Sequence, residues 1–124
     1  PETQVIMALL ESNLLDVFTD CLDGKDLDLR FSDKKAVCLV MTSGGYPGNY
    51  EIGYEITGLD KVKESEVLFA GAEIHQGKVV TSGGRVLNIV ATGDTYQEAR
   101  KKVYQDALTL RFDYAYYRED IGDF

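Results

Sequence analysis

Residues 67–91 constrain the fold most, because their apolar residues follow a spacing of two. Three strand-length segments carry this pattern: 67–72, 78–81 and 85–91. Short glycine-containing stretches separate them, Gln76-Gly77 and Ser82-Gly83-Gly84, and such stretches are typical of hairpin turns. Neighbouring strands joined by short turns run antiparallel, whereas parallel strands need long crossovers. The segment therefore predicts an antiparallel sheet, with Gly71 marking a bulge.

A further strand and a helical segment precede this region. Residues 36–41 form a continuous apolar run of strand length, which indicates a strand buried on both faces. Residues 2–23 place apolar residues near the 3.6-residue period of a helix. We expect that helix to break near Ser12, which could cap its second part, and to stop at Gly24.

One long helix follows the sheet. Thr95 and Glu98 have the spacing of a capping box, which marks a helix start. An apolar stripe follows at Tyr96, Ala99, Val103, Ala107 and Leu110, while Arg100, Lys101 and Lys102 are expected to face water. The aromatic and acidic tail, residues 112–124, is expected to pack on the sheet. The predicted class is α+β: an antiparallel sheet with one long C-terminal helix, preceded by a helical segment.

Composition narrows the function. The 124 residues suffice for one domain, and 13 basic against 21 acidic residues give a net charge of −8. Proteins that coat nucleic acid or anionic membranes need surplus positive charge, so neither partner is expected. Two cysteines are too few for a disulfide scaffold and favour two buried thiols in a reducing cytoplasm. The single histidine, His75, is expected at a solvated hairpin end, and no metal-ligand cluster or catalytic nucleophile–base pair stands out.

Two groups of residues are candidates for ligand binding. The loop Gly44-Gly45-Tyr46-Pro47-Gly48 follows the buried strand, and its glycines could bring backbone N–H groups close to an anion. A connection without a ligand is an equally good interpretation. Lys78 and Arg85 flank one predicted hairpin turn and could converge on an anion. On spacing alone, two solvated edge charges are the better interpretation of that pair.

An ordered set of motifs is more specific. They are Pro1-Glu2-Thr3-Gln4, Ser43-Gly44-Gly45-Tyr46-Pro47-Gly48, Thr57-Gly58-Leu59, Gly83-Gly84-Arg85-Val86-Leu87, Gly93-Asp94-Thr95 and Tyr117-Arg118-x-Asp120-Ile121-Gly122. In this order they resemble the C-terminal part of the phosphoribosylamine–glycine ligase (glycinamide ribonucleotide synthetase) family, within the ATP-grasp superfamily. The resemblance runs from the first residue to the last, and since the chain opens with Pro1 we interpret it as a fragment.

The resemblance implies a cytoplasmic ATP-dependent ligase that joins glycine to 5-phosphoribosylamine in the second step of purine biosynthesis. ATP and Mg²⁺ would serve the intact enzyme, and none is expected to bind this chain, because the family's magnesium ligands lie upstream. The fragment alone is expected to be inactive without the N-terminal and ATP-grasp domains. Pro1, Glu2 and Thr3 would line the active-site rim. Lys78 and Arg85 match a Lys-x6-Arg pattern that holds the substrate phosphate in related purine enzymes, which makes them the preferred phosphate site.

The resemblance also implies a domain boundary. Residues 1–23 would end the ATP-grasp domain, and residues 24–124 would form the small C-terminal domain. Two other functions stay open: a non-catalytic module that binds a ribose phosphate, and a C-terminal domain of the biotin-carboxylase type. The Ser-Gly-Gly-Tyr-Pro-Gly loop argues against the second.

Overall fold

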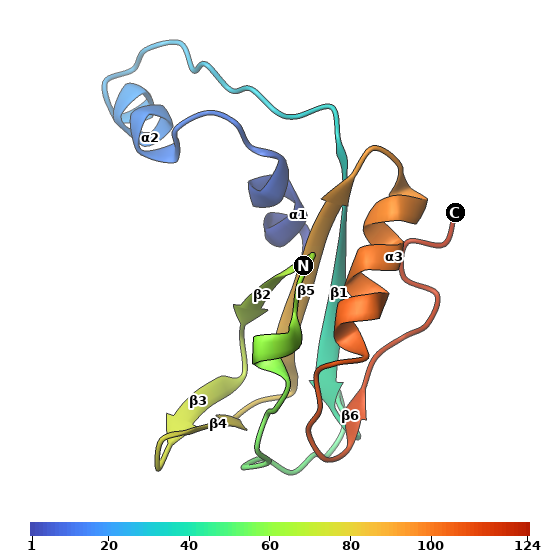
Figure 1. Cartoon of the computed structure of the whole chain (residues 1–124). Coiled ribbons are helices and arrows are strands. Elements are labelled where there is room, and N and C mark those ends of the chain that lie inside the picture. Colours follow the sequence, from blue (N-terminus) through green and yellow to red (C-terminus); the bar gives the residue numbers. More distant parts are fainter.

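The computed structural model describes all 124 residues. In chain order the elements are α1 (Glu2–Leu9), α2 (Leu14–Leu22), β1 (Lys35–Ser43), the short 3-10 helix η1 (Leu59–Lys61), β2 (Glu66–Phe69), β3 (Ala72–His75), β4 (Lys78–Thr81), β5 (Arg85–Gly93), α3 (Tyr96–Ala107) and β6 (Ala115–Tyr116). Figure 1 shows the sheet between α1 and α3, with α2 projecting away from it. The predicted α+β class is confirmed.

Four strands form the main sheet, in the order β2-β5-β1-β6, and every neighbouring pair is antiparallel. The long central pair is β1 and β5, whose register runs from Lys35 opposite Gly93 to Met41 opposite Leu87. The register shifts after Met41, where β6 pairs with the end of β1. The tail thus joins the sheet, as expected.

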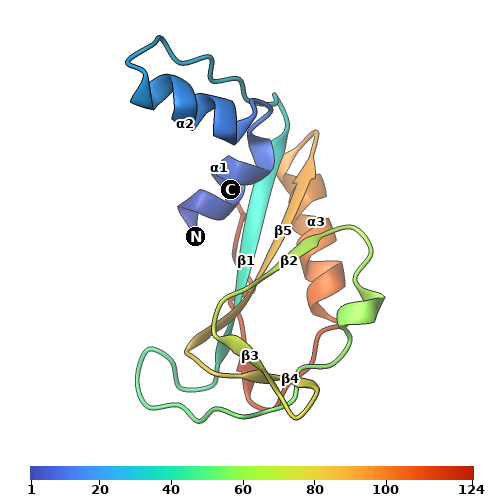
Figure 2. The same ribbon diagram turned by 90° about the vertical axis from the view of Figure 1, so that its left-hand side faces the viewer.

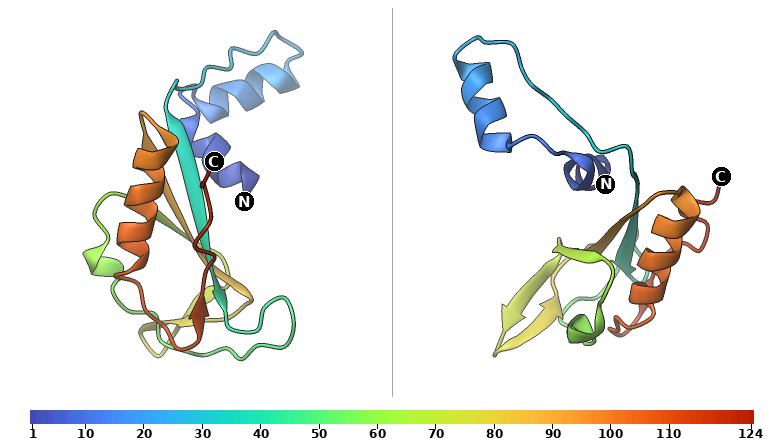
Figure 3. Two further views of the ribbon diagram at one scale, coloured as in Figure 1. Left: turned by 90° about the vertical axis from the view of Figure 1, so that its right-hand side faces the viewer. Right: turned by 45° about the horizontal axis from the view of Figure 1, so that its top comes forward.

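The main core lies on one face of the sheet, under α3 (Figure 3). Alternate β1 residues Val37, Leu39 and Met41 point into this core and are almost fully buried, since successive strand residues face opposite sides. From α3, Ala99 and Val103 pack against them and are completely buried. The expectation of complete burial on both faces of β1 was only partly right, because Val40 and Thr42 on the other face are half-buried.

Helix α3 begins as the capping box predicts. The Thr95 hydroxyl accepts a hydrogen bond from the Glu98 N–H, while the Glu98 carboxylate accepts one from the Asp94 N–H. Tyr96 was expected in the buried stripe but is 42% exposed, and its ring packs only on Phe124, which is itself exposed at the chain end. Lys101 faces water.

Two of the three basic residues on α3 do not face water, contrary to expectation. Arg100 is half-buried and donates hydrogen bonds to backbone carbonyls of the tail. Lys102 donates to the Thr92 carbonyl and pairs with Glu98. These bonds attach the helix to the tail and to the end of β5.

The predicted strand 67–72 is in fact two strands. β2 belongs to the main sheet, whereas β3 pairs with β4 in a separate hairpin that projects from it (Figure 1). The division falls at Gly71, where the chain crosses close to Gly83 and no side chain fits between. Consequently Ser82–Gly84 is not a hairpin turn, and it connects β4 of the hairpin to β5 of the main sheet. The other predicted turn, Gln76-Gly77, is confirmed, with both residues at positive φ and with His75 exposed beside it.

We expect Gly71→Ala to lower the free energy of unfolding by about 2–3 kcal/mol, since overpacking against backbone cannot relax easily. A Cβ at Gly71 would lie 2.6 Å from the Gly83 Cα and 2.7 Å from the Arg85 carbonyl oxygen. Gly24→Ala is the matched control, because Gly24 has a φ of +66° but open space around it, so it should lose only about 1 kcal/mol. Urea unfolding measures both; equal losses would contradict the role of the close crossing.

The predicted break in the N-terminal helical segment is confirmed, but the capping residue is Asn13 and not Ser12. The Asn13 side chain accepts hydrogen bonds from the Leu15 and Asp16 N–H groups. The Ser12 hydroxyl instead donates to the Asp28 carbonyl and accepts from the Arg30 N–H, holding the connector that follows α2. Cys21 on α2 is exposed, contrary to the expected burial, because no other element covers that helix face.

The connection between β1 and β2 runs back to α3. Its residues 55–57 make only isolated bridges, from Glu55 to Val80 and from Thr57 to Arg111. After η1, Asp106 near the end of α3 accepts hydrogen bonds from the Lys63 and Glu64 N–H groups. No helix reaches the length and hydropathy that crossing a bilayer requires.

Candidate ligand-binding site

A hollow of about 300 Å³ lies on the face of the sheet opposite α3, and we call it the arginine pocket. It is lined by Pro1, Cys38, Val40, Thr42, Tyr46, Arg85, Tyr116, Tyr117, Arg118 and Ile121. Its floor comes from β1, whose alternate side chains Cys38, Val40 and Thr42 turn away from the core. In Figure 2 this side of β1 carries α1, whose first residues reach the pocket through Pro1.

The pocket floor is apolar. Cys38 is 9% exposed, and burial raises the pKa of its thiol, so it stays protonated at neutral pH. Val40 lies beside it. Because the floor offers no charge, the two arginines of the rim determine which ligand the pocket can hold.

Arg85 is the first residue of β5 and is exposed. The residue before it, Gly84, is buried against the Tyr46 ring, which a Cβ at that position would overlap. The Ser43 hydroxyl donates to the Gly83 carbonyl at 2.8 Å, and the Ser43 N–H donates to the Gly84 carbonyl at 2.8 Å. These hydrogen bonds join the glycine-rich loop to the Gly83-Gly84 segment. They thereby fix the position of Arg85, the next residue, at the start of β5.

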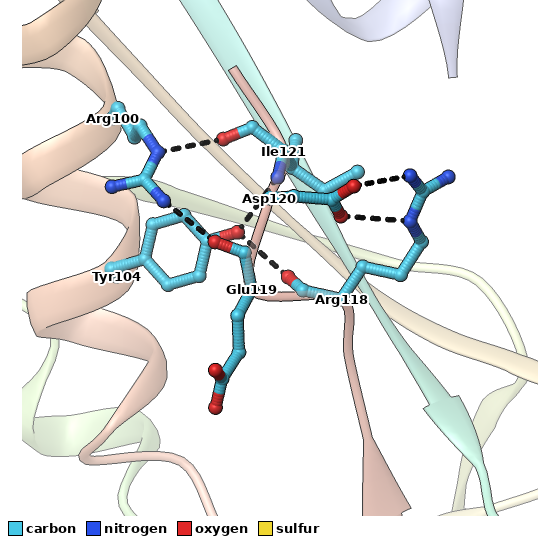
Figure 4. A network of polar contacts seen from close by, with 6 residues as sticks. All are labelled: Arg100, Tyr104, Arg118, Glu119, Asp120 and Ile121. Atoms are coloured by element: carbon cyan, nitrogen blue, oxygen red, sulfur yellow. Dashed lines mark hydrogen bonds and ion pairs between the residues drawn. The ribbon is translucent and has the colours of Figure 1, made fainter. Parts of the chain in front are cut away.

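Arg118 is the second cation of the pocket, and its position is fixed by the tail (Figure 4). Its guanidinium donates two hydrogen bonds to Asp120, at 2.9 and 2.6 Å. This pairing lowers the pKa of the Asp120 carboxyl below its ordinary value and raises the pKa of Arg118. A guanidinium bound in this way by two parallel bonds keeps a defined orientation.

Helix α3 holds the backbone around Arg118 from the other side of the tail (Figure 4). The Tyr104 hydroxyl donates to the Arg118 carbonyl at 2.6 Å and accepts from the Ile121 N–H at 3.1 Å. Arg100 donates to the carbonyls of Glu119 and Ile121 and lies over the Tyr104 ring. Residues 118–121 are therefore fixed by side chains of one helix.

The structure does not bring Lys78 and Arg85 together in this pocket. The expectation that they lie on paired strands was wrong, because β4 pairs with β3 and β5 pairs with β2 and β1. Lys78 lies opposite His75 near the hairpin turn, and its ammonium pairs with Glu55 at 2.7 Å. The role of both residues in phosphate binding stays a prediction.

The other predicted site residues divide between places. Pro1 and Tyr46 line the arginine pocket with Arg85, whereas Gly44 lines a different hollow. The pKa of Glu2 is lowered mainly by its own backbone N–H and next by the amino group of Pro1, with a smaller contribution from Arg85. Thr3 is exposed at the start of α1.

The loop uses part of its own hydrogen-bonding capacity. The Tyr46 N–H donates to the Ser43 carbonyl, and the Gly48 N–H donates to the Gly45 carbonyl. These two N–H groups are therefore not free to bind an anion. The peptide bond before Pro47 is cis. Whether the loop binds a ligand stays a prediction.

Reasoning from single residues missed Arg118. The spacing Arg118-x-Asp120 in the tail could have pointed to an ion pair that orients the arginine. It was not used, because most such pairs lie in solvent and contribute little. No three His, Cys, Asp or Glu side chains lie close enough together to hold a metal ion.

Together these features define a small α+β domain that carries a two-arginine pocket on the face of an antiparallel sheet opposite α3. Residues 36–124 match the family model described as "Phosphoribosylglycinamide synthetase, C domain". The chain belongs to the phosphoribosylglycinamide synthetase C-domain family.

Two of the bacterial relatives carry the same name, and a third relative is a trifunctional protein. The chain is 50% identical to the phosphoribosylamine–glycine ligase of Caldanaerobacter subterraneus and 45% identical to that of Clostridium acetobutylicum, in each case over 98% of this chain and 30% of the relative. It is 42% identical to the trifunctional purine biosynthetic protein adenosine-3 of Gallus gallus, over 98% of this chain and 13% of that protein.

A solved structure with a similar fold carries the same name as the two bacterial relatives. The crystal structure of the Thermotoga maritima phosphoribosylamine–glycine ligase matches with a TM-score of 0.87 and 37% identity, over 98% of this chain and 30% of that one. The chain thus spans about 30% of the length of the phosphoribosylamine–glycine ligases that it matches.

Proposed function

We propose that this chain is the C-terminal part of an ATP-dependent ligase that joins glycine to 5-phosphoribosylamine and forms glycinamide ribonucleotide. The observation that carries the proposal is the match over nearly the whole chain to phosphoribosylamine–glycine ligases, in sequence and in structure. The cytoplasmic location and the use of ATP with Mg²⁺ belong to the same proposal.

Within that enzyme, this chain contributes binding and no bond-breaking group. Arg85 grips the 5′-phosphate of the substrate, because a guanidinium can donate two parallel hydrogen bonds to phosphate oxygens. Pro1, Glu2 and Thr3 lie on the rim next to it. A phosphate is recognised locally, so the net charge of −8 does not oppose this role.

A second cation completes the grip, and two residues are candidates. Arg118 already lines the pocket with Arg85, and its guanidinium is held by Asp120. Lys78, the partner that the sequence suggested, does not line this pocket, and it is paired with Glu55 just as Arg118 is paired with Asp120. The geometry therefore favours Arg118 over Lys78 as the partner of Arg85.

The exposed apolar side chains of the N-terminal helices support a domain boundary in this region. On α2, Leu15, Phe18 and Leu22 are 70, 57 and 89% exposed. Apolar side chains that project together from one helix favour burial against another part of a larger protein. We therefore keep residues 1–23 as the end of the ATP-grasp domain and residues 24–124 as the C-terminal domain.

A chimera tests the proposal. This chain replaces the matching part of the Thermotoga maritima ligase, and ADP formation is measured with ATP, glycine and phosphoribosylamine. We expect turnover that depends on all three substrates. A folded chimera that binds phosphoribosylamine without turnover would favour the second candidate, a non-catalytic ribose-phosphate module.

A further inference from the structure

A second hollow, of about 410 Å³, lies where the loop after β1 meets the segment before β6. We call it the tyrosine pocket, and its lining residues are Gly44, Asn49, Tyr50, Glu51, Tyr54 and Tyr114. None of them lines the arginine pocket. The phosphate site proposed above uses none of these residues, so the ligand of the tyrosine pocket is inferred from the chemistry of the pocket itself.

Aromatic rings form its walls. The rings of Tyr54 and Tyr114 meet edge to face, with centroids 5.4 Å apart, and Tyr50 packs against Tyr46 at 6.2 Å. Tyr114 has a φ of +60°, a backbone conformation that residues with a side chain rarely adopt. Its backbone lies so close to Gly44 that a Cβ there would be 2.7 Å from the Tyr114 carbonyl oxygen. The loop thus holds this ring in an unusual position at the pocket.

The tyrosine pocket carries a negative charge, that of Glu51. Glu51 accepts a 2.5 Å hydrogen bond from the Tyr54 hydroxyl through Oε2, and its side chain is exposed. No basic side chain pairs with Glu51, and none lines the pocket. The bond to Glu51, followed by burial, raises the pKa of Tyr54 to about 12, so the phenol remains a donor at neutral pH.

We propose that the tyrosine pocket binds a small alkylammonium ion. A cation is attracted to aromatic faces within about 6 Å of the ring centroid, and the Glu51 carboxylate supplies the opposite charge. Glu51 would repel an anion, and a neutral ligand would gain no electrostatic attraction from it. Tyrosine faces and a single acidic group thus select for positive charge.

Tetramethylammonium is the probe, and tert-butanol is its uncharged counterpart of similar size. Each is titrated into the 124-residue chain while the ring signals of its eight tyrosines are followed by NMR. We expect tetramethylammonium to shift the rings of Tyr50, Tyr54 and Tyr114 saturably, with a millimolar dissociation constant that weakens as salt increases. Tert-butanol should leave the same rings unchanged.

Two variants test whether the binding of tetramethylammonium takes place in the tyrosine pocket. Glu51→Gln keeps an acceptor for the Tyr54 hydroxyl but removes the charge, and should weaken tetramethylammonium binding by about 3–10-fold. Tyr114→Asn removes one ring and keeps a residue that tolerates positive φ, and should weaken it similarly. Tyr96→Leu, at the far end of α3, is the control and should leave binding unchanged.

Several outcomes would overturn the proposal: no saturation, equal shifts at all tyrosines, equal binding of tert-butanol, or undiminished binding by a folded Glu51→Gln variant. Ligase turnover is not among the readouts, so the alkylammonium proposal and the proposed ligase function fail or succeed separately.

Discussion

Replacing Asp106 by alanine should lower the free energy of unfolding by about 3 kcal/mol, more than any exposed substitution in this chain. Asp106 is only 5% exposed and accepts hydrogen bonds from the Lys63 and Glu64 N–H groups at 3.1 and 2.9 Å. Both bonds are partly buried, and a donor that is left there without an acceptor costs about 1–3 kcal/mol. The segment between η1 and β2 would lose its attachment to α3.

The same carboxylate should make stability depend on acid. Burial is the largest single influence and raises its pKa, but the hydrogen bonds from Glu64 and Lys63 together lower the pKa below 3.8, the ordinary aspartate value. A carboxyl whose pKa is lower in the folded state stabilises the fold above its unfolded pKa. That contribution is fully present at neutral pH and is lost as the pH falls from about 3.8 through the folded pKa.

Urea unfolding at pH 7 and at pH 3 measures both effects. Asp106→Asn keeps one oxygen acceptor without the charge, so it should lose less than the alanine variant and lack the acid-dependent part. Asp60→Ala is the control, since Asp60 is exposed on η1 and makes no side-chain hydrogen bond, and should change stability by less than about 0.5 kcal/mol. An alanine variant at position 106 as stable as this control would refute the anchoring role.

Replacing Arg85 by alanine in the active chimera should raise the KM for phosphoribosylamine by about 10–100-fold. A hydrogen bond between two charged groups contributes about 1.5–3 kcal/mol, and each 1.4 kcal/mol corresponds to a factor of ten. Because the phosphate is held away from the reacting amine, kcat should change much less than KM. The KM values for ATP and glycine should stay the same.

Parallel variants identify the second cation. Arg118→Ala should raise the same KM if the arginine pocket holds the phosphate, and Lys78→Ala should raise it only if the hairpin lysine leaves Glu55 to join. Thr57→Ala, outside the arginine pocket, controls for general effects on the chimera. Unchanged kinetics in the folded Arg85→Ala variant would remove the phosphate assignment.

Local sequence patterns predicted most elements, because each depends on nearby residues. Thr95 and Glu98 are near neighbours, and their spacing was enough to place the start of α3. The apolar run 36–41 predicted β1 because its length and composition are those of a strand. The order of the motifs predicted the family because it can be read from the sequence without knowledge of any contact in the fold.

The pairing of strands could not be predicted in this way. Gly71 permits a close crossing with Gly83, which lies twelve positions later, and that contact separates the hairpin from the main sheet. Spacing along the chain suggested that Lys78 and Arg85 are close, whereas the crossing separates their strands. Arg118 reaches the same pocket as Arg85 only because β6 and α3 hold the tail there, a contact between distant parts of the chain.

The crossing at Gly71 also limits where this domain can vary in length. Residues added at the Gln76-Gly77 tip would extend β3 and β4 into solvent and leave β5 in register. The Gly71 N–H, in contrast, donates to the Arg85 carbonyl at 2.7 Å, at the base of the hairpin. One residue inserted there would shift β5 by a single position and turn the Arg85 guanidinium to the opposite face of the sheet. Insertions should therefore be tolerated at the tip of the hairpin but not at its base.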